Sequence, residues 1–150
     1  MKIDPKHLYQ RIPDTNFSNH NANFQLAQLL TKFMTAQKGI GLAANQVGYN
    51  KRVFVMRIQN QLKQCFNPEI ISINGELIQS KEGCLSFPKD WIDVARPEVI
   101  SVKYFDYRGN PYYETLTGLT ARCFQHELDH LNGITMHQRH KEQNDVSPKS

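Results

Sequence analysis

The spacing of hydrophobic residues along the chain predicts two main helices. Apolar side chains recur at helical spacing from residue 24 onward, so a helix is expected over residues 22–37. The same periodicity returns near the C-terminus and predicts a helix over residues 118–131, with Thr117 at its N-cap. The residues from 137 to 150 are polar, and we expect them to form a frayed tail without a further helix.

Between these helices, β-branched and alternating segments predict several short strands. Residues 52–58 are β-branched and apolar, which is typical of a buried strand. The pair Asn74-Gly75 lies between two such segments and indicates a hairpin turn. The further strands are expected over residues 66–73, 76–79, 98–105 and 112–116, and residues 39–48 are expected to form a loop. This order predicts a single α+β domain over residues 1–150, with small antiparallel sheets.

Composition narrows the class of protein. The chain has 150 residues, of which 39% are hydrophobic, and no apolar run approaches the roughly 20 residues that a membrane span requires. The N-terminal segment has no apolar core of a signal peptide, so we expect a soluble cytoplasmic protein. The net charge of +4 comes from scattered basic residues. These residues are typical of a solvated surface, and a weak preference for an anionic partner such as ribosomal RNA is the lesser alternative. They do not indicate sequence-specific nucleic-acid binding.

The three cysteines do not suggest a disulfide framework. Their number is odd and small, which fits a reducing compartment. Cys65 and Cys123 lie among apolar residues and are expected to be buried. Cys84 differs from both, because Gly83 precedes it and a turn-like Ser-Phe-Pro sequence follows.

The sequence Gln-His-Glu-Leu-Asp-His over residues 125–130 is a candidate metal site. His126 and His130 are four residues apart, so a helix places both imidazoles on one face, and Glu127 lies beside them. Asp129 is a candidate acceptor for an imidazole N–H, although a surface carboxylate is an equal reading. Alone, the pattern is only moderately specific for a metal site, because a helix that carries two histidines can also be an ordinary amphipathic helix.

A catalytic metal needs a third protein ligand. A downstream histidine at the spacing used by one peptidase class would fall at position 136, which is Met136, and His137 and His140 are read as exposed tail residues. A distant downstream glutamate is also unsuitable, since only Glu142 follows. Cys84 is therefore the strongest candidate, and it would leave the fourth tetrahedral position open for water.

These motifs together resemble the peptide deformylase family. The segments that carry the resemblance are Gly39-Ile40-Gly41-Leu42-Ala43-Ala44-Asn45-Gln46, Glu82-Gly83-Cys84-Leu85-Ser86 and Gln125-His126-Glu127-Leu128-Asp129-His130. Their order and spacing also resemble the family, over nearly all of the chain. The resemblance implies small antiparallel sheets around a central helix that carries the two histidines.

The resemblance implies a hydrolase that removes the N-formyl group from the initiator methionine of new polypeptides. In that family, residues matching Cys84, His126 and His130 hold one divalent metal, natively often Fe²⁺, and Zn²⁺, Ni²⁺ or Co²⁺ suit the same ligands. Formyl-Met nascent peptides would be the substrates, with a weak association with the ribosome and none with membranes.

The family also implies roles for the residues around the metal. Glu127 would act as general base and then as general acid, while the Gln46 amide and the Leu85 backbone N–H would stabilise the oxyanion. The peptide would bond to the main chain near Ile40 and Gly41. Further assignments are an apolar wall of Ile40, Leu42 and Leu119 and a supporting ion pair between Glu82 and Arg96.

The chain departs from the family's pattern in two places. Trp91 stands where many bacterial relatives carry an arginine, and it could stack on a peptide or pack against the sheet. The short polar segment over residues 137–150 suggests a compact member that lacks a C-terminal helix. Another small metallohydrolase or peptidase, or a non-catalytic zinc domain, remains an alternative from the His-Glu-x-x-His pattern alone.

Overall fold

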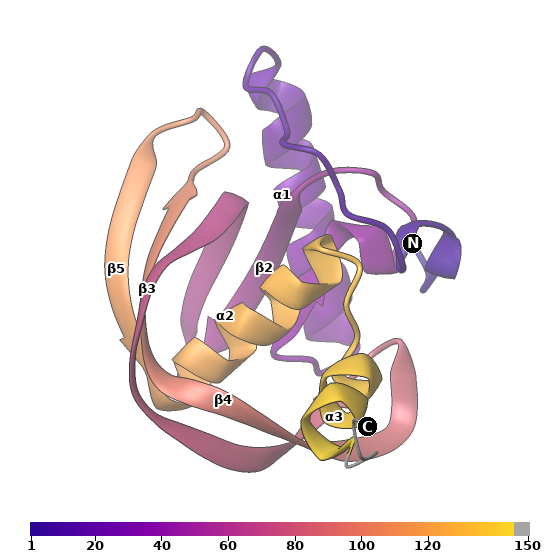
Figure 1. Ribbon diagram of the computed structural model, residues 1–150. Coiled ribbons are helices and arrows are strands. Elements are labelled where there is room, and N and C mark those ends of the chain that lie inside the picture. Colours follow the sequence, from indigo (N-terminus) through magenta and orange to yellow (C-terminus); the bar gives the residue numbers. More distant parts are fainter. Residues whose placement is uncertain (146–150) are drawn as a thin grey trace.

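The fold is an antiparallel sheet curved around one buried helix (Figure 1). The computed structural model describes residues 1–145. The helices are α1 (His20–Ala36), α2 (Gly118–Leu131) and α3 (Met136–Asn144), with short 3₁₀ turns η1 (Pro5–His7) and η2 (Ala44–Gln46). The strands are β1 (Gly41–Ala43), β2 (Val53–Ile58), β3 (Gln61–Cys84), β4 (Phe87–Phe105) and β5 (Pro111–Thr117). They form one five-stranded sheet in the order β1-β2-β3-β4-β5, which confirms the α+β class.

Strand β2 is buried on both faces, and this explains its continuous apolar sequence. Val53 and Val55 pack into the cluster under α1, whereas Phe54 and Met56 pack into the cluster under α2. Successive side chains of a strand point to opposite faces, so each helix receives every second residue. Phe54 meets Phe124 of α2 edge-to-face, with ring centroids 5.0 Å apart. The strand therefore fixes the position of α2.

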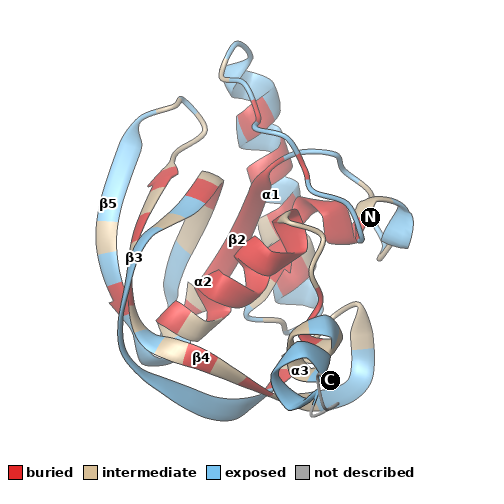
Figure 2. Ribbon diagram, in the orientation of Figure 1, coloured by how far each residue is buried: buried red, intermediate tan, exposed pale blue. Residues whose placement is uncertain are grey.

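Helix α2 runs through the inside of the curved sheet (Figure 2). Its residues from Cys123 to Leu131 are all buried, including the polar ones. The predicted range of 118–131 is confirmed, although the side chain of Thr117 makes no capping hydrogen bond. A helix with buried polar groups on several sides needs partners for each of them, and those partners lie on β3, β4 and α3.

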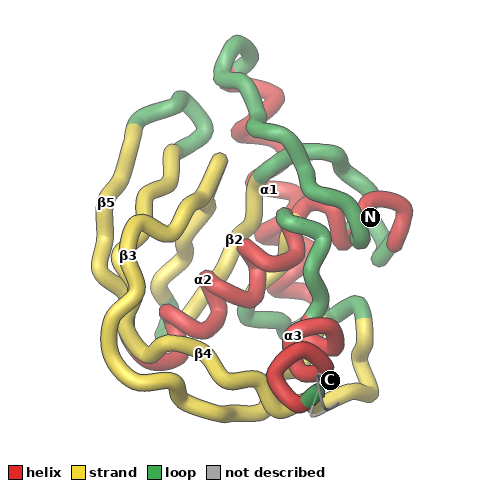
Figure 3. The backbone as a smooth tube through the Cα atoms, in the orientation of Figure 1, coloured by secondary structure: helices red, strands yellow, loops and turns green. Residues whose placement is uncertain are grey.

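The hairpin predicted at Asn74-Gly75 is wrong. Residues 61–84 form one long strand, β3, which pairs with β4 from Phe66 to Cys84 (Figure 3). Gly75 has a positive φ of 77°, and the register shifts between Asn74 and Leu77. The turn-forming residues therefore produce a β-bulge that bends the strand without reversing it. The loop expected over residues 39–48 also contains the short strand β1 and the turn η2.

The frayed tail expected from residue 137, and with it the absence of a C-terminal helix, is wrong within the described residues. Helix α3 covers Met136–Asn144, and the Thr135 side chain caps its first turn through Gln138 N. His137 contacts Asp90 at 2.7 Å and His140 contacts the Asp93 carbonyl at 2.7 Å, so neither is a free surface histidine. Met136 is the one buried residue of α3 and the contacts of His137 and His140 are polar, so no apolar periodicity indicates this helix. Residues 146–150 of the predicted tail lie outside the described residues.

Within residues 1–145, every helix is too short or too polar to traverse a lipid bilayer.

Candidate metal centre

Three potential ligand atoms converge between the end of β3 and the middle of α2. The Cys84 Sγ lies 3.3 Å from the His130 Nε2, and the Nε2 atoms of His126 and His130 are 3.1 Å apart. All three ligand atoms lie within 4.8 Å of one another. The sequence places the two imidazoles one helical turn apart, and the pairing of β3 with β4 brings the sulfur to them.

The orientation of His126 is fixed by a carboxylate from the sheet. Its Nδ1 lies 2.8 Å from the Glu82 Oε1, so it donates to that oxygen and turns its Nε2 toward Cys84 and His130. The expectation that Asp129 could accept from an imidazole N–H is wrong, because this carboxylate binds Arg96 and Arg139 instead. An oriented imidazole is a better ligand, since its lone pair is held in one direction.

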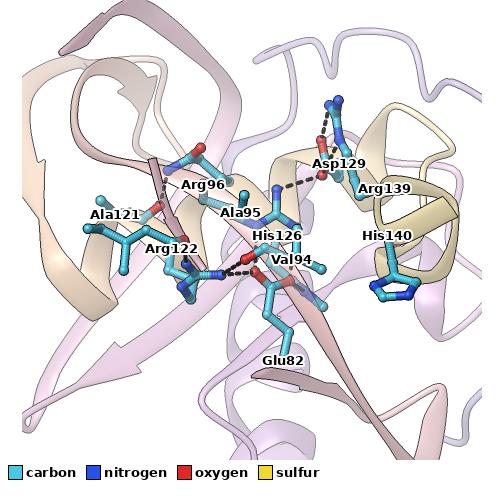
Figure 4. Close-up of polar contacts among 12 residues, drawn as sticks. Glu82, Val94, Ala95, Arg96, Ala121, Arg122, His126, Asp129, Arg139 and His140 are labelled. Carbon is cyan, nitrogen blue, oxygen red and sulfur yellow. Dashed lines mark hydrogen bonds and ion pairs between the residues drawn. The ribbon is translucent and has the colours of Figure 1, made fainter. Parts of the chain in front are cut away.

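Glu82 is the centre of a buried ion cluster (Figure 4). Arg96 approaches it with two nitrogens, at 2.5 and 2.9 Å, which confirms the expected ion pair. Arg122, which the sequence analysis did not identify, donates to the same carboxylate at 2.7 Å. Burial alone would raise the pKa of Glu82, but the hydrogen bonds from Arg96 and His126 outweigh burial and lower it to about 2. Glu82 therefore stays ionised and keeps accepting from His126.

The two imidazoles differ in their affinity for protons. Burial, together with the neighbouring His126, lowers the pKa of His130, so this ring stays neutral as a metal ligand must. Burial also opposes protonation of His126, but its bonds to Cys84 and Glu82 outweigh burial and raise its pKa to about 10. A cation held by these side chains would replace that proton.

Glu127 is the residue placed to exchange protons with a substrate. It is 3% exposed, and its Oε1 has no hydrogen-bond partner among the described residues. Burial is the main cause that raises the pKa of this carboxyl to about 7. Gly41 permits its position, because a Cβ at Gly41 would lie 2.5 Å from the Glu127 Oε2. An unpartnered buried oxygen of this kind indicates a site for a ligand.

The expected oxyanion residues lie beside the sulfur. The Gln46 Oε1 accepts from the backbone N–H of Ala43 at 2.9 Å, which fixes the amide. Its Nε2 then lies 3.0 Å from the Ser86 Oγ and 3.4 Å from the Cys84 Sγ. Leu85 follows Cys84 at the turn between β3 and β4 and lines the same pocket.

A pocket of about 470 Å³ opens onto these side chains. Glu127, Gln46, Cys84 and His126 line it, whereas His130 is almost fully buried behind them. Its apolar rim comprises Ile40, Leu119 and Trp91, which are 48%, 55% and 67% exposed. The expected place of Leu42 in this wall is wrong, because Leu42 is fully buried in the core under α1.

The donor set fits a divalent transition metal. One thiolate and two imidazoles suit Fe²⁺, Zn²⁺, Ni²⁺ and Co²⁺, and three protein ligands leave room for water. The other two cysteines are buried, as expected, and burial raises the pKa of the Cys65 and Cys123 thiols well above the ordinary value. Neither belongs to the ligand group, so Cys84 is the thiol suited to this chemistry.

The sequence analysis did not identify Arg122, Ser86 or Arg139 as neighbours of the site. Ser86 was inside a recognised motif, so its position was available as a signal. Arg122 precedes His126 by four residues on the predicted helix, and this spacing alone places the two side chains on one face. Arg139 lay in the segment predicted as a frayed tail, and no local pattern indicates its contact with Asp129.

Several known proteins with similar sequences and structures are peptide deformylases. The family model described as polypeptide deformylase matches residues 1–146. A peptide deformylase from Thermotoga maritima is 49% identical over 96 residues, which cover 64% of this chain and 58% of that relative. Peptide deformylase 2 from Gloeobacter violaceus is 42% identical over 130 residues, 83% of this chain and 70% of its own length. The alignments with the Thermotoga relatives thus span less than two thirds of those proteins.

Solved structures agree over most of the chain. The crystal structure of peptide deformylase from Thermotoga maritima has a TM-score of 0.84 and 38% identity, and the match covers 98% of this chain and 97% of that one. The enzyme from a Vibrio parahaemolyticus bacteriophage, solved in complex with actinonin, has a TM-score of 0.84 and 37% identity over 91% of this chain and all of its own. On its sequence, its fold and this convergence of side chains, the chain belongs to the polypeptide deformylase family.

Proposed function

We propose that the protein is a metal-dependent peptide deformylase. It hydrolyses the N-formyl group of the N-terminal methionine of newly synthesised polypeptides and releases formate. The observation that supports this most directly is the convergence of Cys84, His126 and His130 beside the buried carboxylate of Glu127, in a member of this family. The Oε1 of that carboxylate has no hydrogen-bond partner in the described part of the chain.

Cys84, His126 and His130 would hold the metal. Fe²⁺ is the native ion that we propose, and Zn²⁺, Ni²⁺ and Co²⁺ are the alternatives with the same ligand preference. When bound, such an ion lowers the pKa of water and so supplies a nucleophile near neutral pH. Glu82 holds His126 in the orientation that this binding requires.

Glu127 moves the protons of the reaction. Its carboxylate accepts a proton from the attacking water and then passes it to the leaving amine. A pKa of about 7 lets one group perform both steps near neutral pH. The absence of a side chain at Gly41 leaves room for this carboxylate where it lines the pocket.

Gln46 and Leu85 stabilise the negative charge that develops on the formyl oxygen. The Gln46 amide is oriented before substrate arrives, because its oxygen already accepts from Ala43. Pre-oriented donors cost no reorganisation during the reaction, and the loss of one lowers the rate by about 10²–10³-fold. The Leu85 backbone N–H is the second donor in this proposal.

The peptide binds along the open edge of β1. Within residues 1–145 this strand pairs with β2 alone, so its other edge is available to receive a peptide as an added strand. The Ile40 carbonyl already accepts from Arg57 N at 2.8 Å, so the main chain of Gly41, which points the opposite way, faces the free edge. Ile40 contributes its side chain, which together with Leu119 forms an apolar wall for methionine.

We also propose that residues 1–150 act as a single metallohydrolase domain. Its partners are formyl-Met nascent chains, which it meets in the cytoplasm with a weak ribosome contact through scattered basic residues. No membrane partner and no sequence-specific nucleic acid belong to this proposal.

The experiment that tests the function compares Glu127→Gln with the unaltered protein, both purified anaerobically. We expect formate release from formyl-Met-Ala-Ser to fall by at least about 10²-fold while the metal content stays constant. Glu98→Gln, an exposed carboxylate on β4, is the matched control and keeps full activity. Chelation abolishes the activity, and added Fe²⁺ or Ni²⁺ restores it. Full activity of Glu127→Gln would contradict the role of Glu127, and cleavage of internal peptide bonds instead of deformylation would identify a peptidase.

A further inference from the structure

Helix α3 docks on the strand that carries Arg96. The side-chain amide of Gln143 both donates to the Ala95 carbonyl and accepts from its N–H, each at 2.9 Å. His140 donates its Nδ1–H to the Asp93 carbonyl at 2.7 Å. These contacts hold α3 against β4 directly beside the buried ion cluster (Figure 4).

A continuous chain of charged contacts runs from α3 to a candidate metal ligand. Arg139 donates hydrogen bonds to both carboxylate oxygens of Asp129, from Nε at 3.0 Å and from Nη2 at 2.8 Å. Asp129 accepts from Arg96 at 2.8 Å, and Arg96 binds Glu82 through two further nitrogens. Glu82 finally accepts from the Nδ1 of His126. We call the chain Arg139–Asp129–Arg96–Glu82–His126 the ion relay.

Burial makes the members of the ion relay depend on one another. Asp129, Arg96 and Glu82 are only 4–6% exposed, so their charges are compensated mainly by side-chain partners and little by water. Arg139 stands at the outer end, where 37% of its side chain is exposed, and Arg122 is a further partner of Glu82. Arg96 is shared between the two carboxylates, and the fork from Arg139 satisfies the oxygen of Asp129 that Arg96 does not reach. Without Arg139, Asp129 keeps Arg96 as its one cationic partner among the described residues and draws the guanidinium away from Glu82.

We propose that Arg139 is a positioning residue for the metal centre, so that the C-terminal helix helps to orient His126 through the ion relay. The consequence for metal binding rests on the proposed function, whereas the orientation of the ring does not. Among the described residues, Arg139 contacts neither the pocket nor a candidate ligand, and its side-chain contacts lead to His126 through Asp129, Arg96 and Glu82.

The first test reads the His126 ring in the metal-free protein. We expect Arg139→Gln to shift the ¹⁵N and Nδ1–H resonances of His126 and to accelerate exchange of that proton by about tenfold or more, since a hydrogen bond to a charged group is weakened. Lys141→Gln removes the same charge from an exposed position of α3 and leaves these signals in place. Wild-type resonances and exchange in Arg139→Gln would overturn the proposal.

The second test measures the release of Co²⁺ from the loaded protein. Loss of groups that orient metal ligands weakens metal binding by about 10–100-fold, so we expect Arg139→Gln to release Co²⁺ about tenfold faster and to alter its visible absorption. Arg139→Lys keeps the charge but not the two-pronged contact, so it gives an intermediate effect and serves as the test if Arg139→Gln fails to fold. An unchanged release rate in both variants would overturn the proposal.

A docking control separates the ion relay from a loosened helix. Gln143→Ala removes two contacts of α3 with β4 and none within the ion relay. We expect it to lower the melting temperature with a smaller effect on His126 than Arg139→Gln, and an equal or larger effect would overturn the proposal. If the unaltered protein binds no Co²⁺, the proposed function fails. The His126 resonances of the metal-free variants still show whether Arg139 orients His126 through the ion relay.

Discussion

At the scale of single residues, the space beside Glu127 is controlled by a glycine. Gly41 belongs to the edge strand β1, and its missing side chain leaves room for both the carboxylate and the buried thiol of Cys123. A Cβ there would lie 2.5 Å from the Glu127 Oε2 and 2.9 Å from the Cys123 Sγ. Glycine is required here by close approach of a functional group, and its φ plays no part.

We therefore expect Gly41→Ala to displace Glu127 and to reduce deformylation by about 10²-fold. The overpacking costs about 1–3 kcal/mol, which corresponds to a fall of a few degrees in melting temperature. Formate release and thermal unfolding of the same preparation measure the two effects. Gly39→Ala is the comparison variant, because its Cβ would meet Leu85 and not Glu127. Unaltered activity of Gly41→Ala would show that Glu127 does not need this space.

The types of site residue could be predicted from the sequence, but their supporting contacts could not. His126, His130 and Cys84 stand out because few other residue types bind a metal at such spacings. The sequence offers Asp129 only as one candidate acceptor for an imidazole N–H, with a surface carboxylate as an equal reading, whereas Glu82 on β3 binds His126. A local pattern cannot rank partners that depend on how β3 and β4 pair.

At the scale of elements, helix α2 could be predicted from the sequence, whereas the full length of strand β3 could not. The boundaries of α2 follow from its own periodicity and its flanking residues, so the sequence predicts them correctly. Strand β3 contains turn-forming residues, and its continuation through them depends on its partner β4. Long-range pairing thus overrides the local preference for a hairpin turn, as it often does in strands.

The bulge at Gly75 gives a prediction about the strand. A non-glycine residue at its φ of 77° costs about 1–2 kcal/mol, so we expect Gly75→Ala to lower the melting temperature by about 2–8 °C. Activity should stay unchanged, because Gly75 does not line the pocket. Thermal unfolding and formate release provide the measurement, and Asn74→Ala, an exposed neighbour, is the control with little effect. A stable Gly75→Ala would indicate that the strand can remove its bulge.

At the scale of the whole molecule, Arg52 connects the N-terminal segment to the end of α2. Its Nη1 donates to the carbonyls of Ile12 and Leu131, at 3.1 and 3.0 Å, and its Nη2 donates to the Asn132 Oδ1 at 2.8 Å. The side chain is buried, and burial lowers the pKa of its guanidinium from the ordinary value. Since Leu131 follows the candidate ligand His130, this contact also fixes the end of the helix that carries the site.

Replacing Arg52 by methionine keeps most of the side-chain volume but leaves buried acceptors without a donor. Each such loss costs about 1–3 kcal/mol, so we expect Arg52→Met to destabilise the protein by about 3 kcal/mol or more. Urea unfolding followed by circular dichroism measures this change. Arg57→Met is the matched control, because among the described residues the Arg57 side chain makes one exposed hydrogen bond, of 3.3 Å to Thr35, and the effect of its loss should stay within about 0.5 kcal/mol. Similar unfolding midpoints for the two variants would mean that the N-terminal segment is held by its apolar residue Ile12, and that the hydrogen bonds of Arg52 add little.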